Sequence, residues 1–265
     1  MPAVLISMIV VPMLVILGFF AAVPVKALGP TAPTLGTAAN FAVLGNSTVT
    51  NTGATTHITG DVGLSNGTSI TGLLSSQVTG TFQIHNATAN ASQIALLAAY
   101  NYAAGLTVGS IAKSGNLGGQ TLVAGLYTST SSLAISSGNL TLSGSATDVW
   151  IFQMGSTLTV TVGRAVNLTG GAVAANVYWQ VGSSATLGVD SKFVGTIMAL
   201  ASITIETGAT LNGRALAHDG AVTMDTNTII KPITTVIPEF SQVLVPLIGM
   251  MFVIAIVSKV RNQKK

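Results

Sequence analysis

The chain contains no cysteine among its 265 residues. Disulfide bonds and thiolate metal sites are therefore excluded. Charge is also scarce, because Lys, Arg, Asp and Glu make up only 6% of the chain, against about 25% in ordinary soluble domains. The central part is rich in Thr, Ser, Gly, Ala and Asn, and apolar residues still alternate through it. This pattern favours tight β-coils with a weakly charged surface and argues against a disordered tail.

The positive charge of the chain is concentrated at its two ends. The whole chain has a formal net charge of +3, but Lys26 and the four cations of 259–265 supply most of the excess. The body between them keeps five cations and six acids, and five minus six gives −1. The body has no basic stripe that would neutralise phosphates, which argues against nucleic acid as a partner. His57 and His85 stand alone, without the spacing of a metal site, so we expect no metal or other cofactor.

The N-terminal region is almost wholly apolar over residues 3–23. Small residues follow, and Val25-Lys26-Ala27 offers a cleavage point, so residues 1–27 are predicted to be a secretory signal peptide. The basic stretch that normally precedes such a run is missing, and an uncleaved anchor is the alternative. Export also agrees with six Asn-x-Ser/Thr sequons, which begin at Asn46, Asn66, Asn86, Asn90, Asn139 and Asn167.

A second apolar run lies near the C-terminus, over residues 243–258, and the basic segment 259–265 follows it. With the residues before it, the run approaches the length of about 20 residues that spans a membrane. The cations after it predict a cytoplasmic tail by the positive-inside rule. We therefore expect an exported protein whose body lies at the extracellular face of the cell envelope and contacts the membrane through this segment.

The segment 231–242 is predicted to be a linker, and it holds the tripeptide Pro238-Glu239-Phe240. Together with the apolar run and the basic tail, this tripeptide resembles the archaeal sorting signals that archaeosortase-type transpeptidases recognise. The resemblance implies a processing enzyme as a partner, removal of the tail and attachment of the protein to a lipid. A plain C-terminal membrane anchor is the alternative, and both hold the body at the outer surface.

Four nine-residue stretches in the second half of the chain align with one another. Each places one threonine between two apolar residues, and the threonines are 27, 18 and 19 residues apart. An imperfect repeat near this length is typical of a β-solenoid. Stacked coils are expected to bring the four threonines into one column, which consists of Thr159, Thr186, Thr204 and Thr223.

The later coils each divide into three short strands, which predicts a mainly β solenoid with three faces. The alanine-rich segment 86–105 differs, and it predicts one long α-helix that ends at Gly105 and packs alongside the solenoid. Ile94, Leu97 and Asn101 are predicted to mark its packed face. We therefore expect one solenoid domain over residues 31–230, with hydrophobic helices at the two ends of the chain.

Several motifs of this region resemble those of the microbial ice-binding proteins, from about residue 34 to residue 230. They include Thr59-Gly-Asp-Val-Gly63, Ala124-Gly-Leu-Tyr127, Gly213-Arg-Ala-Leu216, Gly220-Ala-Val-Thr223 and Val177-Tyr-Trp-Gln-Val-Gly-Ser-Ser-Ala-Thr-Leu-Gly188. The resemblance implies a right-handed, discontinuous solenoid in which an N-terminal strand joins the later coils and one long helix lies alongside. It also implies binding to ice through one flat face.

A column of threonines suits ice for physical reasons, although outward threonine is also common on strands because it is a good β-former. Threonine on a strand is stiff at χ1, its methyl group excludes liquid water and its hydroxyl holds one water molecule. The predicted ice-binding face consists of Thr157, Thr159, Ser184, Thr186, Ser202, Thr204 and Thr223. Two Thr-Gly-Ala-Thr runs, which are similar to a pattern in some family members, predict an alternative ice face of Thr52, Thr55, Thr207 and Thr210.

Two other functions are compatible with a β-solenoid but fit this sequence less well than ice binding. A polysaccharide-degrading enzyme needs clustered carboxylates, but the acids here are scattered, and turn capping explains Asp219 and Asp225 more simply. We therefore expect no enzyme. A surface adhesin or glycan-binding module would stack Tyr127, Tyr178 or Trp179 on sugars, although the alternation of the strand favours a buried Trp179. The expected partner is the ice crystal surface, and the expected state is a monomer.

Overall fold

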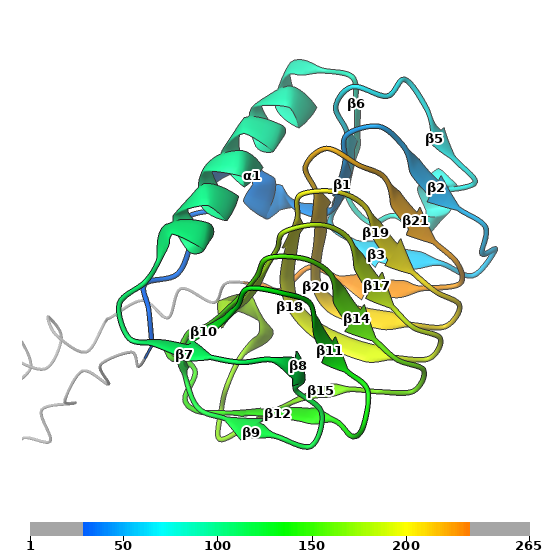
Figure 1. Ribbon diagram of the computed structural model, residues 1–265. Coiled ribbons are helices and arrows are strands. Elements are labelled where there is room, and N and C mark those ends of the chain that lie inside the picture. Colours follow the sequence, from blue (N-terminus) through cyan, green and yellow to red (C-terminus); the bar gives the residue numbers. More distant parts are fainter. Residues whose placement is uncertain (1–28, 234–265) are drawn as a thin grey trace, which may run out of the picture. The chain divides into compact units, whose positions relative to one another are not determined.

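The computed structural model describes residues 29–233, which form a stack of β-coils with one α-helix along its side (Figure 1). The predicted signal peptide 1–27, the apolar run 243–258, the tail 259–265 and the Pro238-Glu239-Phe240 motif lie outside the described residues. Within 29–233, no helix is long and apolar enough to cross a membrane. The predicted helices at the two ends of the chain also lie outside this range.

The largest sheet, called sheet A here, has eleven parallel strands. In spatial order its main path consists of β6 (Phe82–Ile84), β4 (Asp61–Leu64), β1 (Phe41–Gly45), β20 (Thr210–Ala217), β18 (Lys192–Ala199), β16 (Val177–Val181), β13 (Trp150–Met154), β10 (Gly125–Ser129) and β7 (Ser110–Ala112). Off this path, β20 pairs with β22 (Thr228–Ile230), which in turn pairs with β3 (His57–Thr59).

Two further parallel sheets complete the coils. Sheet B consists, in spatial order, of β5 (Ile70–Thr71), β2 (Val49–Asn51), β21 (Val222–Met224), β19 (Ile203–Ile205), β17 (Ala185–Leu187), β14 (Leu158–Val160), β11 (Leu133–Ile135) and β8 (Gly115–Asn116). Sheet C consists of β15 (Val166–Thr169), β12 (Leu140–Ser143) and β9 (Thr121–Leu122).

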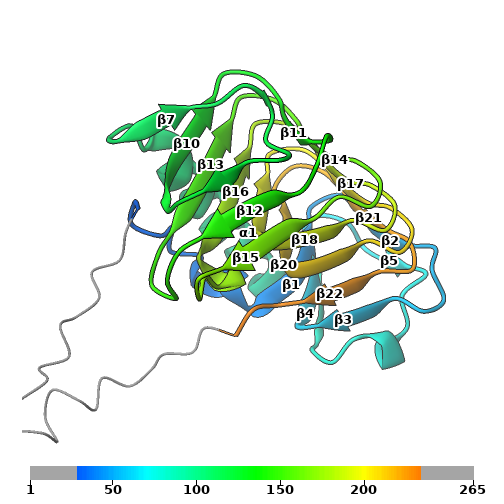
Figure 2. The ribbon, with the colours of Figure 1, turned by 90° about the horizontal axis from the view of Figure 1, so that it is seen from below.

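The chain passes from sheet A to sheet B and then to a third face in each coil (Figure 2). Sheet C forms the first part of the third face, and the first halves of β18 and β20 continue it. The bridge between Ala165 and Lys192 joins the two parts. β18 turns the corner at Gly195, whose φ of 106° suits glycine, and its second half pairs with β16 in sheet A. The predicted mainly β architecture with three faces is therefore confirmed, while its handedness stays a prediction.

The order of strands in space differs from their order in the sequence. β1 pairs with β20, with Val43 opposite Ala215, and β2 pairs with β21, with Thr50 opposite Thr223. The N-terminal coils thus extend the stack beyond the last C-terminal coil, as the family resemblance implied. The α-helix then returns the chain from β6 at one end of sheet A to β7 at the other (Figure 1).

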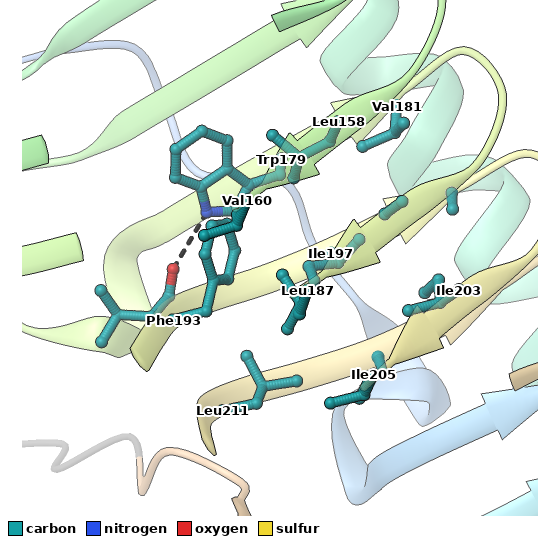
Figure 3. Packing of buried hydrophobic residues seen from close by; sticks show 14 of the residues in the cluster. Leu158, Val160, Trp179, Val181, Leu187, Phe193, Ile197, Ile203, Ile205 and Leu211 are labelled. Atoms are coloured by element: carbon teal, nitrogen blue, oxygen red, sulfur yellow. Dashed lines mark hydrogen bonds between the residues drawn. The ribbon is translucent and has the colours of Figure 1, made fainter. Parts of the chain in front are cut away.

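The interior is filled by aliphatic side chains and an aromatic ladder. Figure 3 shows Trp179 and Phe193 of this ladder among the aliphatic side chains. The rings of Tyr127 and Phe152 stack with centroids 5.2 Å apart, and those of Phe152 and Trp179 with centroids 4.0 Å apart. Phe193 continues the ladder at 4.9 Å from Trp179. The indole Nε1 of Trp179 donates to the carbonyl oxygen of Val194 at 3.0 Å, so this buried polar group is satisfied. The ladder joins four successive strands of sheet A, from β10 through β13 and β16 to β18.

The helix α1 (Ala87–Gly105) covers the outer side of sheet A. Asn86 caps its N-terminus by accepting a hydrogen bond from the backbone of Ala89 at 2.9 Å. The predicted packed face was wrong, because Ile94 is 72% exposed and Asn101 is also exposed. The true packed face combines three large residues with four small ones that permit a close approach to the sheet, and consists of Ala89, Ser92, Gln93, Leu96, Ala99, Tyr100 and Ala103.

Candidate functional site

The outer side of sheet B carries an unbroken column of threonines. Register pairs place Thr159 beside Thr186, Thr186 beside Thr204, and Thr204 beside Thr223, so the structure brings the four threonines of the repeat together. The column continues through Thr50 to Thr71. Six threonines therefore stand in line across β14, β17, β19, β21, β2 and β5, at the strand spacing of about 4.7–4.9 Å.

The sequence prediction missed Thr50 and Thr71. Each lies in a short run of the same type as the repeat, with an apolar residue directly before the threonine, as in Val49-Thr50 and Ile70-Thr71. That local signal was present, but the two residues lie more than 130 positions before Thr204 in the sequence. Only the insertion of the N-terminal coils beyond β21 brings them into the column.

The backbone under the column is held rigidly from inside the stack. The residues on either side of each column threonine in β14, β17, β19 and β21 are buried, for example Leu158 and Val160 around Thr159. Because side chains alternate along a strand, each buried pair forces the threonine between it to face outward. At the other end the column continues through Ala134 to Asn116, so its register positions carry no charged residue.

The column threonines differ from their neighbours in hydrogen bonding. Within residues 29–233, the side chains of the six column threonines make no hydrogen bond to protein atoms. The flanking positions do: Ser132 and Thr157 share a hydroxyl–hydroxyl bond of 2.9 Å, and the hydroxyl of Ser202 accepts from the backbone of Ala221 at 3.1 Å. Ser184 likewise accepts from the backbone of Ser202 at 3.4 Å. The flank therefore ties coils together, whereas the central column keeps its hydroxyls available to water.

The alternative set of threonines does not form one column. Thr52 and Thr207 lie at the corner between sheet B and the third face, where the hydroxyl of Thr207 donates to the Asp225 carboxylate at 2.5 Å. Thr55 lies in the loop before β3, and Thr210 begins β20 on the third face, opposite Thr228. The hydroxyl of Thr52 donates to the carbonyl oxygen of Met224 at 3.4 Å. Two of these hydroxyls are therefore bonded at the corner, and the four threonines do not share a register.

Hydrogen bonding lowers the pKa of Asp225 below its ordinary value. The largest cause is the bond from Thr207, followed by the bond from Thr226, and Thr52 adds a smaller effect in the same direction. Thr226 at this corner has a φ of 57°, a left-handed conformation that is unusual for a β-branched residue. The corner turn is thus stabilised by its carboxylate in the charged form.

The residues proposed for the rival functions are not arranged as those functions require. Asp219 precedes β21 and Asp225 follows it, so the strand separates the two carboxylates. Tyr127, Tyr178 and Trp179 are all buried, which removes them from any sugar-stacking surface. Among residues 29–233 there is also no cluster of three or more His, Cys, Asp or Glu side chains suited to a metal ion.

Comparison with known proteins decides the family. Residues 43–230, which include β2 and every later strand of sheet B, match the family model described as Ice-binding-like. The chain belongs to this family. The family is non-enzymatic, and this protein is accordingly not an enzyme. The matched range contains all six threonines of the column on sheet B.

Curated relatives support the family assignment along most of the chain. An ice-binding protein of Nostoc sp. (strain HG1) is 46% identical over 198 residues, which cover 74% of this chain and 72% of the relative. An ice-binding protein of Flavobacterium frigoris (strain PS1) is 39% identical over 216 residues, or 75% of this chain and 76% of the relative.

Solved structures of the Ice-binding-like family share the architecture. The crystal structure of an ice binding protein from an Antarctic biological consortium is 52% identical, with a TM-score of 0.73, and covers 78% of this chain and 94% of that one. The DUF3494 domain of ice-binding protein 1 from Shewanella frigidimarina reaches a TM-score of 0.74 at 26% identity, over 78% of this chain and 100% of that domain. The mainly β fold with parallel sheets and a single helix is therefore that of the family.

Proposed function

We propose that this protein binds ice crystals through the outer side of sheet B. The centre of the site is the column of Thr50, Thr71, Thr159, Thr186, Thr204 and Thr223. The flanking Thr157, Ser184 and Ser202 belong to the same face. The observation that carries the proposal is the unbroken line of six threonines on a sheet side that no element of residues 29–233 covers, with hydroxyls that make no hydrogen bond to those residues.

The column suits an ordered water lattice better than liquid water. Each threonine has few rotamers on a strand, and its buried neighbours hold the backbone, so little entropy is lost when water becomes ordered against it. Each contact is weak, but a rigid array makes many contacts at once, and their effects multiply into lasting attachment. Ice is then forced to grow in curved bulges between adsorbed molecules, which slows growth and recrystallisation.

The proposal includes display at the cell surface. The predicted signal peptide 1–27, the Pro238-Glu239-Phe240 motif and the apolar run 243–258 support export followed by attachment to a membrane or lipid, with an archaeosortase-type enzyme as the processing partner. Such attachment would concentrate the activity at the envelope. Treatment of whole cells with an impermeant protease tests this part: loss of the protein from intact cells is expected, and full protection would contradict outward display.

The ice-binding face is tested by a matched pair of substitutions. Thr186 and Thr141 both lie in the middle of a strand and are half-buried, but Thr186 faces outward from sheet B and Thr141 from sheet C. Thr186→Tyr should remove most of the thermal hysteresis, because a bulky ring in mid-column lifts the flat face from the crystal. Thr141→Tyr should leave it unchanged, and both variants should unfold at nearly the same temperature. Unchanged activity in Thr186→Tyr would move the site to another face.

A third variant separates the two candidate faces. Thr210→Tyr changes a member of the alternative set on the third face while the column stays intact. We expect ice activity to survive this change. Loss of activity in Thr210→Tyr with retention in Thr186→Tyr would assign the site to the alternative set of Thr52, Thr55, Thr207 and Thr210.

A further inference from the structure

The two ends of the described chain lie at the same corner of the stack. Gly29 packs against the starts of β10 and β13, since a Cβ built on it would lie 2.2 Å from the carbonyl oxygen of Val149 and 3.1 Å from the nitrogen of Gly125. Both strands begin sheet A directly after the third face. The N-terminal end therefore lies where the third face meets sheet A.

The C-terminal end leaves from the same corner, further along the stack. Ile230 is the last residue of β22 and pairs with Asn212 of β20, and the backbone of Lys231 donates to the carbonyl oxygen of Thr59 at 3.0 Å. Asn212 directly precedes the point at which β20 passes from the third face into sheet A, where Ala215 pairs with β1. Ile233 beyond it is 84% exposed, so nothing described covers this exit.

This corner is the one that does not touch sheet B. Since each coil runs from sheet A to sheet B and then to the third face, the corner between the third face and sheet A lies across the coil from sheet B. Figure 2 shows the described ends on the side away from β17 and β21. Any tether joined to either end therefore starts from the side opposite the threonine column.

We propose that the protein holds ice while it is tethered by its ends, so that one molecule links an ice crystal to a lipid membrane. This inference rests on the proposed ice-binding role of sheet B. The membrane is the partner that the apolar segment 243–258 fits. A tether at the corner of Gly29 and Ile233 leaves the whole of sheet B free. A tether attached to sheet B itself would place the membrane on the side where the ice crystal must lie.

The absence of cysteine permits a direct test with the full chain, because a single introduced thiol fixes the point of attachment. Ile233→Cys places the thiol at the exit corner, and Thr204→Cys places it in mid-column. Each variant is coupled to maleimide-coated beads at equal density, and the fraction of beads held by slowly growing ice is measured. The same variants, capped with a small thiol reagent, are assayed for thermal hysteresis in solution.

We expect Ile233→Cys beads to be held by ice. Thr204→Cys beads should be held at least about tenfold less than the hysteresis of the capped Thr204→Cys variant accounts for, since only attachment at Ile233→Cys leaves the many contacts of the array free. Equal retention of the two kinds of bead would overturn the tether proposal, and so would loss of Ile233→Cys beads while the capped Ile233→Cys variant stays active. Absence of hysteresis in the capped Ile233→Cys variant would instead overturn the ice-binding role, so the two failures are distinguishable.

Discussion

Sheets A and B are built from the same coils and share one core, yet the outer side of sheet A is packed against other elements and the outer side of sheet B is not. The outer side of sheet A is apolar, with Leu126, Ile151, Tyr178 and Leu216 buried beneath α1 and its neighbours. The outer side of sheet B carries threonine and serine, and no element within residues 29–233 covers it. A large exposed apolar patch invites association, so the first surface requires a cover. A column of hydroxyls and methyl groups does not.

The energetic roles of the two outer sides differ for the same reason. Side chains outside sheet A contribute to folding, because they pack against α1, whose Gln93 also donates to the carbonyl oxygen of Ala217 at 3.0 Å. Among residues 29–233, the six column threonines outside sheet B make no side-chain hydrogen bond to the protein, while the flanking serines and Thr157 tie coils together. Substitutions should therefore cost stability on sheet A and activity on sheet B, and the predictions below test that separation.

The largest effect on stability is expected from truncation under the helix. Leu96 is fully buried between α1 and sheet A, so Leu96→Ala should destabilise the protein by about 2–5 kcal/mol through lost burial and a cavity. Thr186→Ala on sheet B should change stability by no more than about 0.5 kcal/mol. Urea unfolding of the two variants measures the difference. Similar losses in both would show that the outer sides are not energetically distinct.

A smaller loss of stability is expected at the junction between the N-terminal segment and sheet A. Arg214 is buried there, and it donates to the carbonyl oxygen of Ala39 at 3.1 Å and to the hydroxyl of Thr196 at 3.3 Å. Burial lowers the pKa of Arg214, and nearby Tyr178 partly opposes the shift. Arg214→Ala leaves both oxygen atoms without this donor and should cost about 1–3 kcal/mol. Lys192→Ala, at an exposed position of the neighbouring strand β18, is the control and should unfold like the parent protein.

Within sheet B, the position along the column should set the size of the loss of activity. Thr204 lies between column neighbours on both sides, whereas Thr71 lies at the end, in the last strand of the sheet. Because energetically important residues cluster near the centre of an interface, Thr204→Tyr should abolish most thermal hysteresis and Thr71→Tyr should lower it only about twofold. Equal losses would indicate that ice contacts the whole column uniformly. A larger loss for Thr71→Tyr would displace the centre of the site toward the N-terminal coils.

Much of the fold was predictable because it depends on local signals. Alternation around Thr159, Thr186, Thr204 and Thr223 predicted both the outward side chains and the shared register. The alanine content of 86–105 predicted the helix within one residue of its observed start at Ala87. These features depend on neighbours along the chain or on a repeat of similar spacing.

The remaining features depend on contacts between distant segments. Thr50 belongs to the column only because β2 pairs with β21, far along the chain. The packed face of α1 was predicted wrongly because alanine is compatible with either side of a helix, so the alanine-rich sequence does not determine which side packs. The contact with sheet A determines it, and this contact buries Leu96 and leaves Ile94 exposed. The hydrogen bond from Thr207 to Asp225 likewise requires two successive coils to lie side by side. This bond distinguishes a corner threonine from the column threonines, and composition alone does not predict it.

The smallest expected effect concerns the acid stability of the corner beside sheet B. Hydrogen bonds, first from Thr207 and then from Thr226, lower the pKa of Asp225 in the folded protein below its unfolded value of about 3.9. The unfolded state therefore binds more protons in this range, so the contribution is present above about pH 4 and is lost as pH falls through the folded pKa. Asp225→Asn should flatten the fall of melting temperature below about pH 4 while the ice activity of the column stays unchanged at neutral pH. If the melting temperature of Asp225→Asn falls with pH in parallel with that of the parent protein, the corner hydroxyls do not stabilise the charged carboxylate of Asp225. The hydroxyls of Thr52 and Thr207 would then be available to contact ice.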